Sequence, residues 1–98
     1  MKISKEHQEH HQDKLLKRLN RISGQVNAVK KMVEEGNEDN YDKILIQINA
    51  ARSALQRVSQ ILLEAQADHA LLRVEDGANV ADEMEKLQQV IKQYNKIN

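Results

Sequence analysis

The amino-acid sequence predicts an all-α fold, in which three helices form one small domain. Two observations carry this prediction. Apolar residues recur at alternating steps of four and three positions, which is the 3.5-residue average of helices that pack knobs-into-holes. The 98 residues also include no Phe, Trp, Cys or Pro, and a core of Leu, Ile, Val, Ala and Met suits packed helices better than a sandwich or a barrel.

The first predicted helix covers residues 12–35. Gly36 follows its last apolar position, as expected for a glycine at a helix C-terminus. Gly24 lies in mid-helix, where a glycine costs about 1 kcal/mol relative to alanine; it either lets another backbone approach closely or is simply tolerated. The apolar positions of this helix are Leu15, Leu19, Ile22, Val26, Val29 and Val33.

The second and third predicted helices cover residues 40–70 and 79–95. Asp39 or Asn40 can cap the second helix and Asn79 the third, because short polar side chains accept hydrogen bonds from the first free N–H groups of a helix. The apolar positions are Ile44, Ile48, Ala51, Leu55, Val58, Leu62 and Ala65 in the second helix, and Val80, Met84, Leu87, Ile91 and Tyr94 in the third.

The second helix carries a further apolar stripe on another face, through Ile46, Ala50, Ala54 and Ile61. A helix that must bury two faces, in a chain this small, predicts self-association. The expected assembly is an antiparallel dimer built around the first two helices, which could pair again to form a tetramer. The alternative is that the third helix folds back and covers the second stripe.

The composition excludes several classes of protein. A chain without cysteine has no disulfides, thiolate metal sites or thiol nucleophiles. No apolar run approaches the roughly 20 residues that span a bilayer, and the N-terminus lacks the hydrophobic stretch of a signal peptide, so we expect no membrane partner and a cytoplasmic location. The sequence shows no nucleophile with a nearby base and no glycine-rich phosphate loop, so an enzyme is not expected.

Basic residues gather in the first helix, although the 15 basic and 15 acidic residues of the chain cancel. Lys14, Arg18 and Arg21 form one ridge at i, i+4 and i+7, Lys17 lies on the next row, and no acid occurs from Lys14 to Lys31. Such a ridge can neutralise DNA phosphates without reading bases. The alternative is an ordinary solvated helix face.

Arg57 interrupts the further apolar stripe of the second helix, between Ala54 and Ile61. Its spacing allows two interpretations. The guanidinium either pairs with a carboxylate across a subunit interface or emerges at the interface edge toward a phosphate.

Histidines provide a possible metal site in residues 1–12, a segment we expect to be a polar tail that precedes a single helical domain at 13–98. His7 has i, i+3 and i, i+4 spacing to His10 and His11, which places two imidazoles on one helical face. Together with further ligands, such a pair can bind a divalent first-row metal. His69 could join them, although a lone histidine is more often a surface residue.

Three sequence blocks resemble a known family. They are Arg18-Leu19-Asn20-Arg21-Ile22-Ser23-Gly24-Gln25-Val26, Met32-Val33-Glu34-Glu35 and Ile44-Leu45-Ile46-Gln47-Ile48-Asn49-Ala50. Together they resemble the copper-sensing operon repressors and their nickel/cobalt-, formaldehyde- and persulfide-responsive relatives. The resemblance extends from about residue 13 to residue 94.

The resemblance implies a three-helix protomer, an antiparallel four-helix-bundle dimer and a disc-shaped tetramer of two dimers. Members of this family bind double-stranded operator DNA, repress nearby efflux or detoxification genes and release the DNA when an inducer binds. The arginines that they use toward DNA match Arg18 and Arg57, which leaves supporting roles for Lys14, Lys17 and Arg21.

The family's metal-ligand positions are altered in this chain. The usual cysteine, histidine and further cysteine or histidine are replaced by Tyr41, Gln66 and Ala70. A phenol, an amide and a methyl group cannot form a Cu(I)–thiolate site, because soft metals select soft ligands. The positions that usually relay inducer binding fall at Asn40 and near Glu85 or Lys86, so this relay is in doubt.

The inducer is therefore unknown, and several functions stay open. The chain could sense a divalent metal through His7, His10, His11 and His69, or a small polar molecule in the cavity left by the missing metal site. It could also bind DNA constitutively. An alternative of a different class is a helical oligomerisation module that does not bind DNA.

Overall fold

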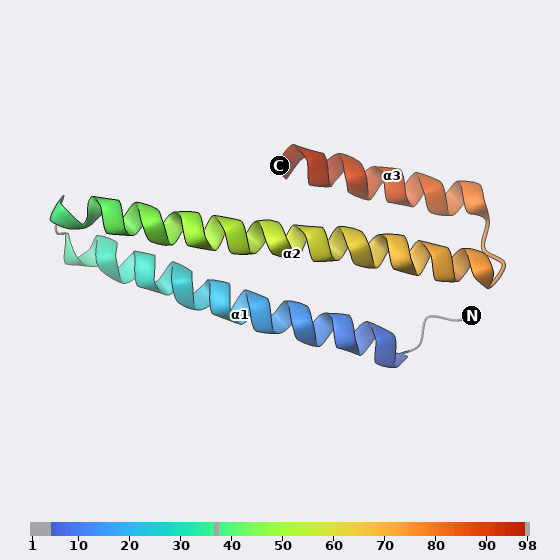
Figure 1. Ribbon diagram of the computed structural model, residues 1–98, viewed down its shortest axis with the longest axis horizontal. Coiled ribbons are helices and arrows are strands. Elements are labelled where there is room, and N and C mark those ends of the chain that lie inside the picture. The colour runs from blue at the N-terminus through green and yellow to red at the C-terminus, as the bar shows by residue number, and fades with distance from the viewer. Residues whose placement is uncertain (1–4, 37, 98) are drawn as a thin grey trace.

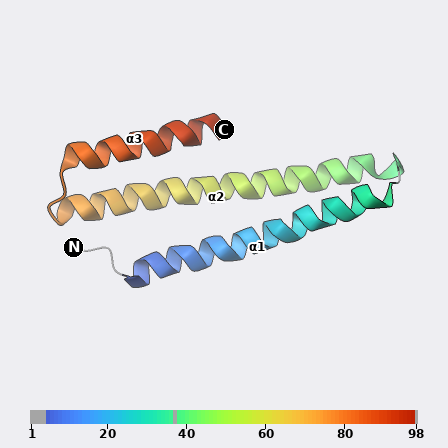
Figure 2. The same ribbon diagram turned by 180° about the vertical axis from the view of Figure 1, so that it is seen from behind.

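The computed structural model describes the backbone of residues 5–36 and 38–97 and the side chains of residues 11–36 and 39–96. In Figures 1 and 2, the first two helices run antiparallel, and the third folds back along the C-terminal half of the second, on the side away from the first. The described residues form no strand, so the all-α prediction is confirmed. The elements in order are α1 (Lys5–Glu35), the 3-10 turn η1 (Glu38–Asn40), α2 (Tyr41–Glu75) and α3 (Val80–Ile97).

Two helices are longer than predicted. α1 begins at Lys5 and not at residue 12, and α2 ends at Glu75 and not at residue 70. Residues 5–12 carry no apolar period, yet they contain neither Gly nor Pro, so the helix continues through most of the segment that we expected to be a tail. The apolar pattern thus begins later in the sequence than the helix itself.

The helix ends follow local backbone chemistry. Gly36 and Gly77 adopt positive φ values of 67° and 99°, where an L side chain would be strained. Asn79 caps α3 as predicted, because its Oδ1 accepts a hydrogen bond from the Asp82 N–H at 3.1 Å. Asn40 occupies the N-cap position of α2, but its side chain makes no capping hydrogen bond.

The core of one protomer is thin, in a molecule that measures 59 × 28 × 14 Å. Ile48, Leu55 and Leu62, which we predicted on the packed seam of α2, are 43–51% exposed. Ile61 of the further stripe is instead only 3% exposed, whereas Ile46 of the same stripe is 63% exposed. α3 therefore does not cover the whole of that stripe. The buried apolar residues are Ile22, Ala51, Val58, Ile61, Ala65 and Ala70.

The packed face of α3 also differs from the prediction by a partial rotation of the helix. Met84 and Ile91, predicted as core positions, are 49% and 38% exposed. Glu83 is buried and Leu87 and Val90 are half-buried, so the row that faces α2 starts at a charged residue. The prediction was wrong here because a carboxylate was not expected within the packed row.

Gly24 does not mediate a close approach within the protomer. It is exposed, and a Cβ atom added there would meet no atom within 4 Å.

None of the helices, searched over the described residues, is long and apolar enough to span a membrane.

Candidate nucleic-acid interface

Four of the predicted DNA-binding residues lie on α1. Lys14, Lys17 and Arg21 are exposed. Arg18 is half-buried, so its guanidinium has less freedom of movement than the charged groups of the three exposed side chains. None of the four forms an ion pair with another residue whose side chain the structure describes. Their positive charge is therefore not neutralised by a neighbouring described carboxylate.

Arg57 lies on the surface of α2. Its Nη1 donates a hydrogen bond to Oε1 of Gln60 at 3.2 Å and lies 3.7 Å from Oε1 of Glu64. Both side chains of the Arg57–Glu64 pair are exposed, at 44% and 64%. The carboxylate beside Arg57 thus belongs to its own helix, and exposed pairs of this kind contribute only about 0–1 kcal/mol. A phosphate can compete with Glu64 for this guanidinium.

Lys14, Lys17, Arg18 and Arg21 form the basic cluster of α1. The antiparallel packing brings Arg57 to the level of this cluster along the helix axes. His11 of α1 contacts His69 of α2, and Val26 of α1 borders the same groove as Ile48 and Leu55 of α2. Counting one residue back on α2 for each residue forward on α1 places Arg57 level with the Arg21 end of the basic cluster. Basic residues that are far apart in sequence thus come to a similar level along the helix pair.

The altered ligand positions cannot meet within one protomer. Tyr41 begins α2 and is 61% exposed, whereas Gln66 and Ala70 lie in its C-terminal half. At 1.5 Å per residue, about 37 Å of helix separates Tyr41 from Gln66. Among the described side chains, no group of three or more His, Asp or Glu residues is placed to hold a metal ion.

The structure brings together two of the four histidines. The rings of His11 and His69 lie edge to face, with centroids 5.5 Å apart and an interplanar angle of 77°. The side chains of His7 and His10 lie outside the described residues, although the backbone of position 7 is one helical turn before position 11 in α1. Sequence spacing could not find the His11–His69 contact, because it depends on the register between two helices.

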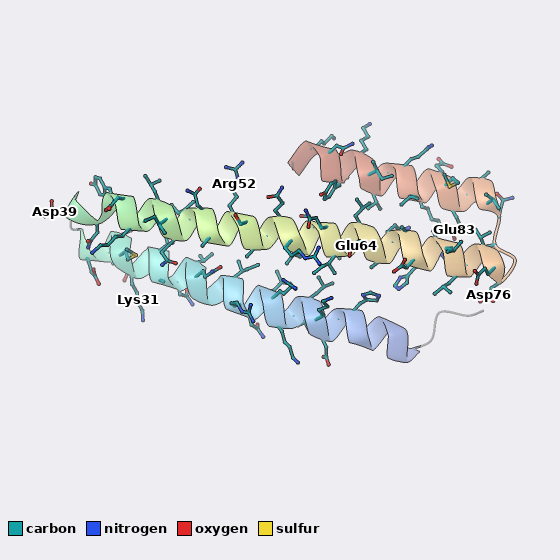
Figure 3. The ribbon with its side chains drawn as sticks, viewed as in Figure 1. Lys31, Asp39, Arg52, Glu64, Asp76 and Glu83 are labelled. Carbon is teal, nitrogen blue, oxygen red and sulfur yellow. The ribbon has the colours of Figure 1, made fainter. Side chains whose placement is uncertain are left out.

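The sequence did not predict a part-buried ion pair between α2 and α3. Arg73 Nε donates a hydrogen bond to Oε1 of Glu83 at 2.8 Å, and Glu83, on the side of α3 that faces α2, is only 4% exposed (Figure 3). Lys86 Nζ lies 3.9 Å from the same oxygen. A signal was present: Glu83 stands between Val80 and Leu87 at three- and four-residue steps, where an apolar residue is expected.

Comparisons with known proteins all point to transcriptional repressors. Residues 11–94 match the family described as metal-sensitive transcriptional repressors. The copper-sensing transcriptional repressor CsoR of Bacillus subtilis is 33% identical over 84 residues, which are 86% of this chain and 81% of that protein. The copper-sensing transcriptional repressor RicR of Mycobacterium tuberculosis is 40% identical over 72 residues, covering 71% of this chain and 72% of that protein.

A solved structure is similar as well. The nickel-responsive transcriptional regulator InrS superposes with a TM-score of 0.73 at 32% identity, and the match covers 84% of this chain and 90% of that one.

Proposed function

Because the chain belongs to the family of metal-sensitive transcriptional repressors, we propose that it represses transcription by binding double-stranded operator DNA through its basic residues. This membership confirms the resemblance found in the sequence. The relatives are transcriptional repressors and not enzymes, in agreement with the expectation from the sequence. Because the relatives CsoR and RicR come from bacteria, whose DNA lies in the cytoplasm, we propose a cytoplasmic location for this protein. The proposed DNA-binding residues are Lys14, Lys17, Arg18, Arg21 and Arg57.

One observation carries the proposal: the basic cluster of α1 has no ion-pair partner among the described side chains, and the fold adds Arg57 at the same level. Arginine and lysine that face solvent without a neutralising carboxylate attract the phosphate backbone. Phosphate contacts of this kind position a protein on DNA, and sequence preference then comes from base edges or DNA shape.

Salt dependence of DNA binding tests this proposal. We expect the protein to shift a fragment of the DNA upstream of its own gene, in preference to an unrelated fragment of equal length. Affinity should fall steeply with salt, by roughly 10³-fold between 50 and 200 mM if about six phosphates are neutralised. Fluorescence anisotropy over a salt series measures the slope. A stable oligomer that shifts neither fragment at 50 mM salt would favour the helical oligomerisation module instead.

We also propose that the protein functions as a dimer or tetramer, because one protomer leaves an apolar face of α1 and α2 exposed. Val26, Ile48 and Leu55 border one groove between α1 and α2, and all three are 43–52% exposed. Soluble monomers rarely expose large contiguous apolar patches. The face is extended along both helices at seven-residue steps by Leu19, Val33, Tyr41 and Leu62. A second copy in antiparallel orientation would complete a four-helix bundle.

Replacing Leu55, near the middle of this apolar face, is expected to break the assembly. Leu55→Glu would place a charge in a desolvated contact, so sedimentation equilibrium should show an 11.3 kDa monomer where the parent protein sediments as a dimer or tetramer. Asn49→Glu adds the same charge at an exposed polar position of the same helix and should leave the mass unchanged. A parent protein that is already monomeric at micromolar concentration would refute the proposed assembly.

A second candidate function is a divalent metal sensor, favoured by the contact between His11 and His69. The two imidazoles come from different helices, so a metal bound by both would link the N-terminal part of α1 to the C-terminal half of α2. His7 and His10 are the further histidines that could join them. Imidazole suits Ni(II), Co(II), Zn(II) and Cu(II), whereas a chain without thiolates offers no Cu(I) site of the usual kind.

We expect Ni(II) or Co(II) to release the protein from DNA if these histidines form the sensing site. The release should be lost in a His7→Ala/His10→Ala/His11→Ala variant. In His69→Ala, the metal concentration needed for release should rise at least tenfold. Anisotropy of a labelled DNA complex, with chelator added to reverse the effect, measures this response. DNA binding that is unchanged by all four divalent metals would remove the metal-sensor function and leave the repressor proposal intact.

A further inference from the structure

We propose that the groove between the C-terminal half of α2 and α3 binds a small organic or inorganic anion through its carboxylate or phosphate group. The groove has a volume of about 550 Å³. Its lining combines two cations, three carboxamides and one apolar residue, and contains no acid: Arg73, Lys86, Gln66, Gln89, Gln93 and Val90. None of these residues belongs to the proposed DNA-binding set.

The charge of the groove favours an anion. Glu83 is the carboxylate that contacts both cations, at 2.8 Å from Arg73 Nε and 3.9 Å from Lys86 Nζ. Two cations therefore share one acid, which leaves an excess positive charge beside the groove. The acid is 4% exposed and does not line the groove, whereas the Arg73 and Lys86 side chains are 35% and 63% exposed. An entering ligand thus meets the cations and not the carboxylate.

The geometry of Arg73 suits recognition of an oxyanion. Its Nε donates to Glu83, and its two terminal amino groups make no hydrogen bond with any described residue. A guanidinium held at Nε presents its remaining donors in a fixed fork, which matches the two oxygens of a carboxylate or phosphate. Because the buried carboxylate already holds the side chain in place, less conformational entropy is lost on binding. Gln66 and the two glutamines of α3 supply neutral N–H donors around it.

The groove lies apart from the basic cluster of α1. Figures 1 and 2 show α3 on the side of α2 away from α1. An anion at this site would bridge α2 and α3, since both helices contribute donors. The proposal stands independently of DNA binding, so it is tested on the protein without DNA.

Calorimetric titration of the full chain with inorganic phosphate and, separately, with succinate tests the site. Both arms are run at constant ionic strength with chloride as the background anion. We expect saturable binding of at least one of the two, and the arm that binds more tightly identifies the anion class. The thermal midpoint should rise with the concentration of that anion, because a ligand that binds only the folded state stabilises it.

Matched variants distinguish this groove from general charge effects. Lys86→Gln removes a cation of the groove and should weaken binding about tenfold, as loss of a single charge-assisted contact does. Gln93→Glu, made separately, should also weaken anion binding, because it introduces a negative charge into the lining of the groove. Lys92→Gln makes the same charge change on an exposed residue of α3 outside the groove and should leave affinity unchanged. Absence of saturable binding in both arms, or equal losses in Lys86→Gln and Lys92→Gln, would overturn the proposal without affecting the DNA-binding result.

Discussion

Arg18→Ala combined with Arg57→Ala is expected to weaken operator binding about 100-fold at moderate salt. Each arginine that contacts a phosphate contributes about one unit to the slope of log affinity against log salt, so the double variant should also lose about two units of slope in each protomer. Both positions lie level with the same stretch of the helix pair, and neither is in the core. The measurement is anisotropy with labelled upstream DNA over a salt series, together with circular dichroism to verify folding.

Glu64→Gln is a control variant that should change the affinity for DNA in the opposite direction. Glu64 lies 3.7 Å from Arg57 Nη1, so a phosphate must compete with it for the guanidinium. Removing that charge should raise affinity by about three-fold, a size consistent with the 0–1 kcal/mol of an exposed ion pair. In an Arg57→Ala background the same change should have a smaller effect. If the Arg18→Ala/Arg57→Ala double variant bound the fragment as the parent does, these residues would not contact DNA and the proposed interface would be wrong.

Arg73→Met is expected to destabilise the fold by about 3 kcal/mol, the lower end of the range for breaking a buried ion pair. The variant leaves the Glu83 carboxylate 4% exposed and without its 2.8 Å donor. Lys86 is close enough to compensate in part, which is why we expect the lower value. Urea unfolding, followed by circular dichroism at one fixed protein concentration, measures the loss.

The double variant Arg73→Met/Glu83→Leu should recover most of this stability. Replacing both charges with apolar groups removes the buried carboxylate whose desolvation causes the loss, and the groove bordered by Ala70, Val74 and Leu87 beside Glu83 is apolar. A double-mutant cycle over Arg73 and Glu83 should therefore show that their effects on the free energy of unfolding are strongly coupled. Lys86→Met, which removes only an exposed 3.9 Å contact, should cost little. An Arg73→Met variant as stable as the parent would show that Arg73 does not support Glu83.

The basic cluster of α1 was predictable because it follows from spacing within one helix. Lys14, Arg18 and Arg21 share a ridge wherever that helix is placed, and their charge does not depend on a partner. The position of Arg57 was predictable only in part. Spacing on α2 left open a carboxylate across a subunit interface and a phosphate at the interface edge. Within the protomer Arg57 contacts Glu64 of its own helix, a partner that neither interpretation included.

The packed face of α3 shows where a local pattern was insufficient. Val80, Met84, Leu87 and Ile91 form a valid helical stripe, yet Val80, Met84 and Ile91 are largely exposed in the protomer. The apolar surface of α3 is wider than the surface that α2 covers, so the pattern alone could not say which half would be buried. Burial of Glu83 needs Arg73 on the facing helix, a contact made between residues ten positions apart across a turn.

By itself, the sequence determined the all-α class, the number of helices, the basic ridge and the absence of thiolate chemistry, because each depends on residue type and on neighbours within one helix. Only the tertiary structure decided which apolar rows are covered, at which level of α1 Arg57 lies, and that His11 contacts His69 and Arg73 pairs with Glu83. Those outcomes depend on the register and rotation of helices against one another. That register is decided by packing free energy summed over many contacts and not by any short stretch of residues.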